Sequence, residues 1–195
     1  PATQAIRKMW ERLDPMYLNP YETADTMEQL SAADLQQFID QWFNSVSLQM
    51  LVHGNHTAAD VNQLALVAEQ AFLTDATRID WPGRDVRRIP SEELVEDISI
   101  DHQDSVFVAA YQGAESTHTA QAKYRLLAEL VRTDFFTELR TNQQLGYLVS
   151  ASYSKLDRVP GIRMVIQSST AGPKVLQQRI DTFIVNQKEK LTAMT

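Results

Sequence analysis

The sequence contains no cysteine, and this absence removes several classes of protein at once. Without cysteine there is no disulfide framework, no thiol nucleophile and no zinc site with sulfur ligands. There is also no apolar run of about 18 or more residues, so the sequence predicts no membrane-spanning helix. A basic segment leading into an apolar one, the pattern of a signal peptide, is missing from the first residues.

Positive charge is scarce as well. The 195 residues carry 18 lysines and arginines against 25 aspartates and glutamates, which gives a formal net charge of -7. A phosphate backbone or an anionic membrane would repel such a chain, so we expect neither nucleic acid nor a membrane as a partner. Because 44% of the residues are apolar, the chain can bury a sizeable core.

A metal-binding pattern is also lacking. The four histidines include the pair His53-Gly-Asn-His56, but the intervening Gly54-Asn55 would break the helix that normally presents such a pair on one face. No His-x-x-Glu-His or its inverse occurs. A zinc hydrolase needs three ligands and a general base, so we predict that this chain holds no catalytic zinc and no catalytic residue.

The first part of the chain shows a helix, a strand and a second helix. Ser31 and Asp34 have the spacing of an N-terminal capping box, and the apolar residues of 35–42 then fall on one helical face. Leu48–His53 is a short apolar run closed by a Gly-Asn turn, which predicts a buried strand. Apolar positions in 61–72 indicate the second amphipathic helix.

A connector separates this part from the next. Residues 74–91 contain Trp81-Pro82-Gly83 and a charged stretch, with no helical period. We predict a domain boundary near Arg84, which divides the chain into residues 1–84 and 85–195.

The second part changes to a period of two around one long helix. We expect the order strand, strand, helix, strand, strand, helix, at residues 94–100, 106–111, 120–140, 147–153, 162–167 and from Pro173 onward. The first two strands should form a hairpin. Helices that cover one face of a mostly hairpin-connected sheet make an α+β layered sandwich.

One segment joins the end of the long helix to the next strand and carries three informative residues. Arg140, Gly146 and Tyr147 lie within eight positions of one another. An ordinary interpretation explains each of them, since arginine favours the negative end of the helix dipole, glycine permits a turn and tyrosine suits a strand. From the residues alone this ordinary interpretation is the preferred one, and a functional interpretation stays open as the alternative.

The run Leu139-Arg-Thr-Asn-Gln-Gln-Leu-Gly-Tyr147, followed by Gly161-Ile-Arg-Met-Val-Ile-Gln-Ser168, closely resembles a signature in the C-terminal half of the pitrilysin/insulysin family, the long-chain inverzincins. Met50-Leu-Val-His-Gly-Asn55 resembles the strand and turn that end the third domain of that family. Family members are zinc metallopeptidases with four related α/β domains, two per half, around a closed chamber. The resemblance implies two-layer α/β sandwich units of the inverzincin (LuxS/metallohydrolase-like) type. Residues 1–84 would be the C-terminal part of the third domain, and 85–195 most of a truncated fourth.

The same resemblance implies roles for two residues. The family's zinc ligands and catalytic glutamate belong to its first domain, so zinc would be a cofactor of the full-length protein only. Arg140 and Tyr147 match the arginine and tyrosine that contact the substrate backbone near the scissile bond. The partners would be peptide substrates and the N-terminal catalytic half, and the fragment alone would be inert.

Two other functions remain open. The full-length protein could be a structural or assembly subunit that kept the fold and lost catalysis, although the presence of both Arg140 and Tyr147 counts against this. A free-standing peptide-binding module would need a natural start near Pro1, and a chain that begins there and ends within a helical pattern is expected to be an internal fragment. By analogy with bacterial members we expect the periplasm, with the cytoplasm as the alternative.

Overall fold

A computed structural model describes residues 1–80, 83, 85–90 and 92–193. Contacts within the chain divide it into two units, Pro1–Asn19 together with Arg84–Thr195, and Pro20–Gly83. The boundary predicted near Arg84 falls on a residue outside the described ranges, as do Trp81 and Pro82 of the connector. Assignment of residues 1–84 and 85–195 to two family domains stays a prediction.

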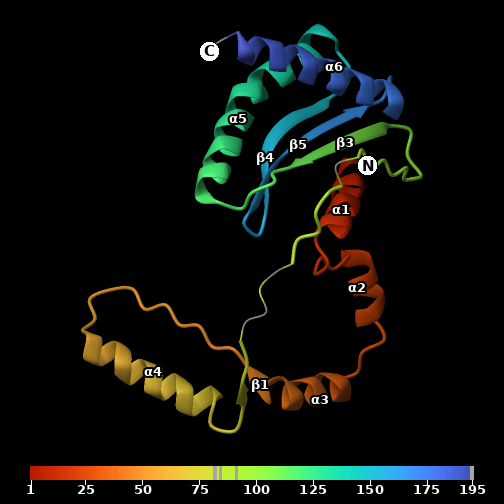
Figure 1. The fold of residues 1–195 in the computed structure, drawn as a ribbon. Coiled ribbons are helices and arrows are strands. Elements are labelled where there is room, and N and C mark those ends of the chain that lie inside the picture. Colours follow the sequence, from red (N-terminus) through yellow and green to blue (C-terminus); the bar gives the residue numbers. More distant parts are fainter. Residues whose placement is uncertain (81–82, 84, 91, 194–195) are drawn as a thin grey trace. The chain divides into compact units, whose positions relative to one another are not determined.

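The first unit contains an antiparallel sheet of three strands (Figure 1). These are β3 (Ser105–Gln112), β4 (Leu148–Leu156) and β5 (Val159–Ser168), in the order β3-β5-β4. The central strand β5 pairs with β3 from Ser105 opposite Ser168, and with β4 from Leu148 opposite Gln167. Because β5 has a neighbour on each side, nearly all of its residues are buried.

Helices α5 (His118–Phe136) and α6 (Pro173–Thr192) cover one face of this sheet (Figure 1). Apolar side chains alternate along each strand, so one set from all three strands faces these helices. The rings of Phe135 and Phe183 meet edge to face with centroids 5.0 Å apart. The buried core consists of Ala109, Val131, Phe135, Leu139, Val149, Ala151, Ile162, Met164, Ile166, Leu176, Ile180 and Phe183.

A further helix, α1 (Ala2–Leu13), contacts β3 and β5. The side chain of Gln167 alternates with the core residue Ile166, and its amide oxygen accepts a hydrogen bond from the Ala2 backbone N–H. The start of α1 therefore lies against the face of the sheet opposite α5 and α6. No helix among the described residues has the length and apolar character required to cross a membrane.

Three predicted strands and two predicted helices of this unit are confirmed. Residues 106–111, 148–153 and 162–167 fall in β3, β4 and β5, with Tyr147 one position before β4, and Pro173 begins α6 as expected. The strand predicted at 94–100 is wrong. This segment has no strand structure, its Leu94 and Val95 are exposed, and the position beside β3 is taken by β5.

The second unit consists of helices and two very short strands. The helices are α2 (Pro20–Met27), α3 (Ala32–Trp42) and α4 (Ala58–Phe72). The strands β1 (Ser45–Val46) and β2 (Thr77–Arg78) pair in parallel. None of the described residues from 20 to 83 is buried.

Both helices predicted in this part are confirmed, including the capping box of α3, in which Ser31 and Asp34 each accept from the other's backbone N–H. The buried strand predicted at Leu48–His53 is wrong. The segment has no strand structure and Leu51 is 92% exposed. An apolar run becomes a buried strand only where a sheet and a covering layer receive it, and the two-residue strands of this unit provide neither.

Candidate substrate-contact site

The long helix changes its winding before it ends. The prediction of one helix over 120–140 is correct in extent, but α5 stops at Phe136 and a π-helical segment, η1 (Thr137–Asn142), follows without a break. The Gln143 N–H donates to the Glu138 carbonyl at 3.0 Å, five positions back. Single π-helical turns are rare and occur often at functional sites.

Arg140 lies in this π-helical turn. The preceding Leu139 is fully buried in the core, which anchors the turn, and Arg140 itself is half-buried. Within the described part of the chain, no side chain forms an ion pair or a hydrogen bond with its guanidinium. A cation beside the last helical carbonyls also fits the helix-dipole interpretation.

Gly146 is required for a reason other than the predicted turn. Its φ is not in the left-handed region, which is occupied instead by Gln144 at φ 52°. A Cβ on Gly146 would lie 2.1 Å from the backbone carbonyl oxygen of Gln167. The absence of a side chain therefore lets the chain pass directly against β5, which places Tyr147 beside Gln167.

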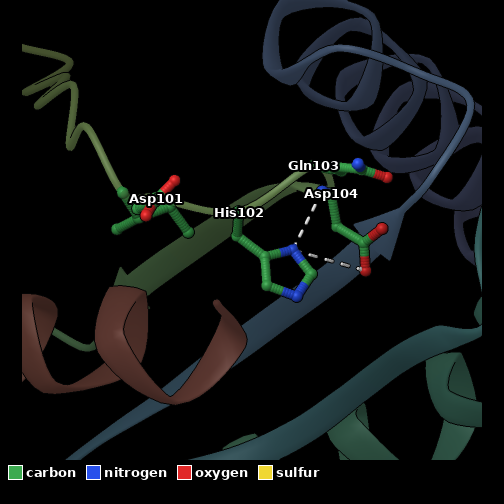
Figure 2. Close-up of a pocket in the computed structure, with 5 residues that line it drawn as sticks. Asp101, His102, Gln103 and Asp104 are labelled. Atoms are coloured by element: carbon green, nitrogen blue, oxygen red, sulfur yellow. Dashed lines mark hydrogen bonds and ion pairs between the residues drawn. The ribbon is translucent and has the colours of Figure 1, made fainter.

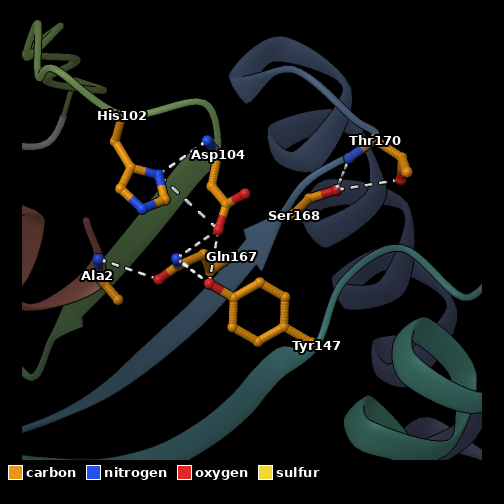
Figure 3. Close-up of polar contacts among 7 residues, drawn as sticks. All are labelled: Ala2, His102, Asp104, Tyr147, Gln167, Ser168 and Thr170. Carbon is orange, nitrogen blue, oxygen red and sulfur yellow. Dashed lines mark hydrogen bonds and ion pairs between the residues drawn. The ribbon is translucent and has the colours of Figure 1, made fainter.

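The hydroxyl of Tyr147 is held by two side chains, Asp104 from the turn before β3 and Gln167 from β5 (Figure 3). It donates to Oδ2 of Asp104 at 2.6 Å, and it accepts from the Nε2 of Gln167. The same Gln167 nitrogen also donates to Asp104 Oδ2 at 2.8 Å. Tyr147 as a residue is 57% exposed, so an ordered hydroxyl belongs to an accessible tyrosine.

These contacts move two pKa values in opposite directions. Hydrogen bonds from Tyr147 and then from Gln167 lower the pKa of the Asp104 carboxyl, since both stabilise its charged form. Donation to Asp104 raises the pKa of the Tyr147 phenol, because the bond requires its proton. At neutral pH the pair is therefore a carboxylate and a protonated phenol.

His102 completes the turn that precedes β3. Its Nδ1 accepts a hydrogen bond of 2.9 Å from the Asp104 backbone N–H and lies 4.0 Å from Asp104 Oδ2. The turn borders a shallow recess lined by Ile100, Asp101, His102, Gln103 and Asp104 (Figure 2). Nearly half of the His102 side-chain surface is exposed.

The structure brings together only part of what the sequence predicted. No hydrogen bond joins Arg140 to Tyr147 in the described part of the chain, and Tyr147 instead meets Asp104 and Gln167. Asp104 was missed because β3 was expected to pair with residues 94–100. The actual pairing of Ser105 with Ser168 is the signal that would have placed Asp104 beside Gln167.

Chemically, the arrangement can bind a polar backbone group. A phenol and a guanidinium both donate hydrogen bonds to carbonyl oxygens. No group of three or more histidine, aspartate or glutamate side chains that could hold a metal ion occurs among the described residues. The described residues therefore do not fit a zinc ion.

Comparisons with known proteins all find similarity to one group of metallopeptidases. Residues 126–195 match the family described as PQQ synthase PqqF-like, C-terminal lobe domain 4. The chain is 28% identical over 172 residues to "Nardilysin-like" of Arabidopsis thaliana, a match that covers 84% of the chain and 17% of that relative. It is 23% identical over 181 residues to human "Insulin-degrading enzyme", covering 89% of the chain and 18% of that relative.

The fold agrees as well. A crystal structure of pitrilysin superposes with a TM-score of 0.64 at 22% identity, over 93% of this chain and 20% of that one. The chain thus has a mixed helix and strand fold similar to part of pitrilysin, and it spans about a fifth of the length of these relatives. By these comparisons the chain is similar to the pitrilysin/insulysin (M16) family of metallopeptidases, and it fits a fragment of the C-terminal half of its members.

Proposed function

We propose that this chain is the substrate-contacting, non-metal-binding part of the C-terminal half of a zinc metalloendopeptidase that degrades peptides in a closed chamber. The N-terminal catalytic half would supply zinc, its ligands and the general base. The chain alone would be inert. The three-stranded sheet with α5 and α6 on one face supports its assignment to the two-layer sandwich units of the inverzincins.

Within that enzyme, Arg140 and Tyr147 would bind the backbone of the peptide substrate. Tyr147 can donate to the carbonyl oxygen at which negative charge develops during hydrolysis, and the planar Arg140 fork can hold a neighbouring carbonyl. The observation that carries this proposal is the combination of an exposed Tyr147 with a hydroxyl held in a fixed place.

The runner-up function is a structural or assembly subunit of the same fold without catalysis. A histidine and glutamate zinc motif in the N-terminal half of the full-length protein would decide for the enzyme. We place the enzyme in a bacterial periplasm by analogy with family members there, and the cytoplasm is the alternative compartment.

The test is a pair of substitutions in the full-length protein. Tyr147→Phe removes one hydroxyl and keeps the ring, so it should lower the rate of cleavage of a short fluorogenic peptide by roughly 100-fold, as for other oxyanion donors. Arg140→Lys keeps the charge but loses the planar fork, and it should also impair turnover. The melting temperatures of both variants should hardly change.

The matched control is Tyr111→Phe, since Tyr111 lies in β3, is partly exposed like Tyr147, and has a hydroxyl without a hydrogen bond to a described residue. Its cleavage rate should equal that of the wild type. If both site variants cleave at the wild-type rate, Arg140 is only a helix-end cation and Tyr147 only a strand residue. The subunit function then becomes the better one.

A further inference from the structure

Gln167 has a fixed orientation on the sheet. Its side chain is only 5% exposed, and its Oε1 accepts a hydrogen bond of 3.2 Å from the Ala2 backbone N–H. That oxygen must face α1 for the Ala2 N–H to be satisfied, because a buried donor without a partner is costly. The Nε2 of Gln167 is therefore directed to the other side, toward Asp104 and Tyr147 (Figure 3).

The two N–H groups of this amide have two acceptors. One is Asp104 Oδ2 at 2.8 Å and the other is the phenol oxygen of Tyr147. Since the phenol oxygen accepts from Gln167, the single proton of Tyr147 is free to serve Asp104, at 2.6 Å. Each polar atom of the Gln167 amide and the Tyr147 hydroxyl thus has a defined role.

The oxygen and the proton of Tyr147 are held by different groups. Rotation about the phenol C–O bond moves the proton without moving the oxygen, so the hydroxyl can exchange one acceptor for another while Gln167 keeps the oxygen in place. When the Tyr147 hydroxyl turns away, Asp104 loses this donor. Its carboxylate keeps the hydrogen bond from Gln167 and lies near His102.

We propose that Gln167 is the positioning residue for Tyr147, that its amide fixes the phenol oxygen, and that Asp104 holds the phenol proton until a substrate oxygen accepts it. This inference rests on the proposed function, because it assumes that Tyr147 donates its proton to a substrate oxygen when the substrate is bound. It predicts that loss of Gln167 affects turnover only through Tyr147.

The first experiment measures the contact itself in the full-length protein labelled with [¹³Cζ]tyrosine. The Tyr147 resonance is assigned by its loss in Tyr147→Phe. At pH 10, where an ordinary tyrosine is about half ionised, Tyr147 should remain mostly protonated. Asp104→Asn removes the charged acceptor and should raise the ionised fraction, whereas Asp101→Asn in the same turn should not. Equal ionisation in wild type and Asp104→Asn would overturn the assignment of the proton to Asp104.

The second experiment is a double-mutant cycle on kcat. Gln167→Met keeps the length of the side chain but cannot donate, and it should lower kcat roughly 10-fold with a smaller change in KM. In a Tyr147→Phe background the same substitution should have no further effect. Gln177→Met, at a partly exposed glutamine of α6 that donates a hydrogen bond to Glu93, is the matched control and should leave kcat unchanged.

The outcomes separate the two proposals. An equal loss from Gln167→Met in both backgrounds means that Gln167 acts independently of Tyr147 and overturns this inference, while the role of Tyr147 stands. A Tyr147→Phe variant with wild-type kcat overturns both. If Gln167→Met does not fold, the same cycle with Asp104→Asn decides, since Asp104 is coupled to the same hydroxyl.

Discussion

At the scale of single residues, Gly146 shows how one missing side chain builds a site. Its backbone passes so close to the Gln167 carbonyl oxygen that a Cβ would lie 2.1 Å from it, far inside van der Waals contact. The neighbour is backbone in the central strand, which cannot move without disturbing pairing on both sides. This close approach of Gly146 to β5 therefore determines the position of the adjacent Tyr147.

We predict that Gly146→Ala destabilises the protein by roughly 1–3 kcal/mol, the usual cost of inserting a group into a closely packed region. The control is Gly172→Ala at the N-cap of α6, where a Cβ would meet nothing within 4 Å. Its effect should stay below about 1 kcal/mol. Urea denaturation measures both, and equal midpoints for the two variants would show that β5 yields to the added methyl group.

At the scale of elements, α5 and α6 are joined by a polar contact at the edge of the core. The Asp134 carboxylate accepts from Lys190 Nζ and from Gln187 Nε2, each at 2.6 Å. Donation by Lys190 first, and by Gln187 second, lowers the pKa of Asp134. A depressed pKa adds stability above the unfolded value of about 3.9, and this stability is lost as pH falls through the folded value.

The Asp134→Asn variant should therefore melt about 2 °C below wild type at pH 7, a small effect because the ion pair is partly exposed. The difference should shrink when the pH is lowered through the acid range, where wild type also loses the charge. Asp181→Asn on α6, at a carboxylate without an ion pair to a described residue, is the control. Scanning calorimetry gives the melting temperatures, and a difference that does not change with pH would remove Asp134 ionisation as its cause.

The elements differ in how well the sequence predicts them. The second-part strands 147–153 and 162–167 were predictable because their alternation reports burial on one side of a sheet. The segments 48–53 and 94–100 show similar apolar runs, but strand formation depends on partners that a local pattern does not reveal. The π-helical turn at 137–142 was hidden for a related reason, since α-helical and π-helical turns share the same residues.

The candidate site was predictable in part for the same reasons. Arg140 and Tyr147 were found through a motif, which is a local run of sequence. Asp104 and Gln167 are distant in sequence, and they meet only because β3 and β5 pair in one particular register. A polar contact between strands cannot be deduced before the register is known.

At the scale of the whole molecule, the two units differ in how much buried apolar core stabilises them. The unit with β3, β4 and β5 has a continuous buried core, whereas the described residues 20–83 include none that is buried. Aromatic rings of that second unit contact one another in a series from Phe38 through Trp42 and Phe43 to Phe72, and all four residues are exposed by 45% or more. Burial of apolar surface is the main stabilising term in folding, so the second unit should open far more readily.

Limited proteolysis of the 195-residue chain should therefore cut first within residues 20–91, including the predicted connector at 74–91. Helix α5 should survive until the first unit unfolds. Mass spectrometry of the early fragments identifies the cut sites. Early cleavage inside α5, with residues 74–91 intact, would mean that the connector is packed and that the two units do not differ in stability.

The position of β5 at the centre of the sheet also governs when the site can exist during synthesis. Ala2 is synthesised before Gln167, yet its hydrogen bond is to this residue 165 positions later. The strand β3 likewise has no partner until β5 has been made, and closing such long loops is slow. When Asp104 and Tyr147 have been synthesised, β5 with Gln167 is still missing, so the two side chains cannot yet be fixed beside each other. The hydrogen bonds of the Tyr147 hydroxyl with Asp104 and Gln167 are therefore among the last contacts that form during folding, because they require the completed sheet.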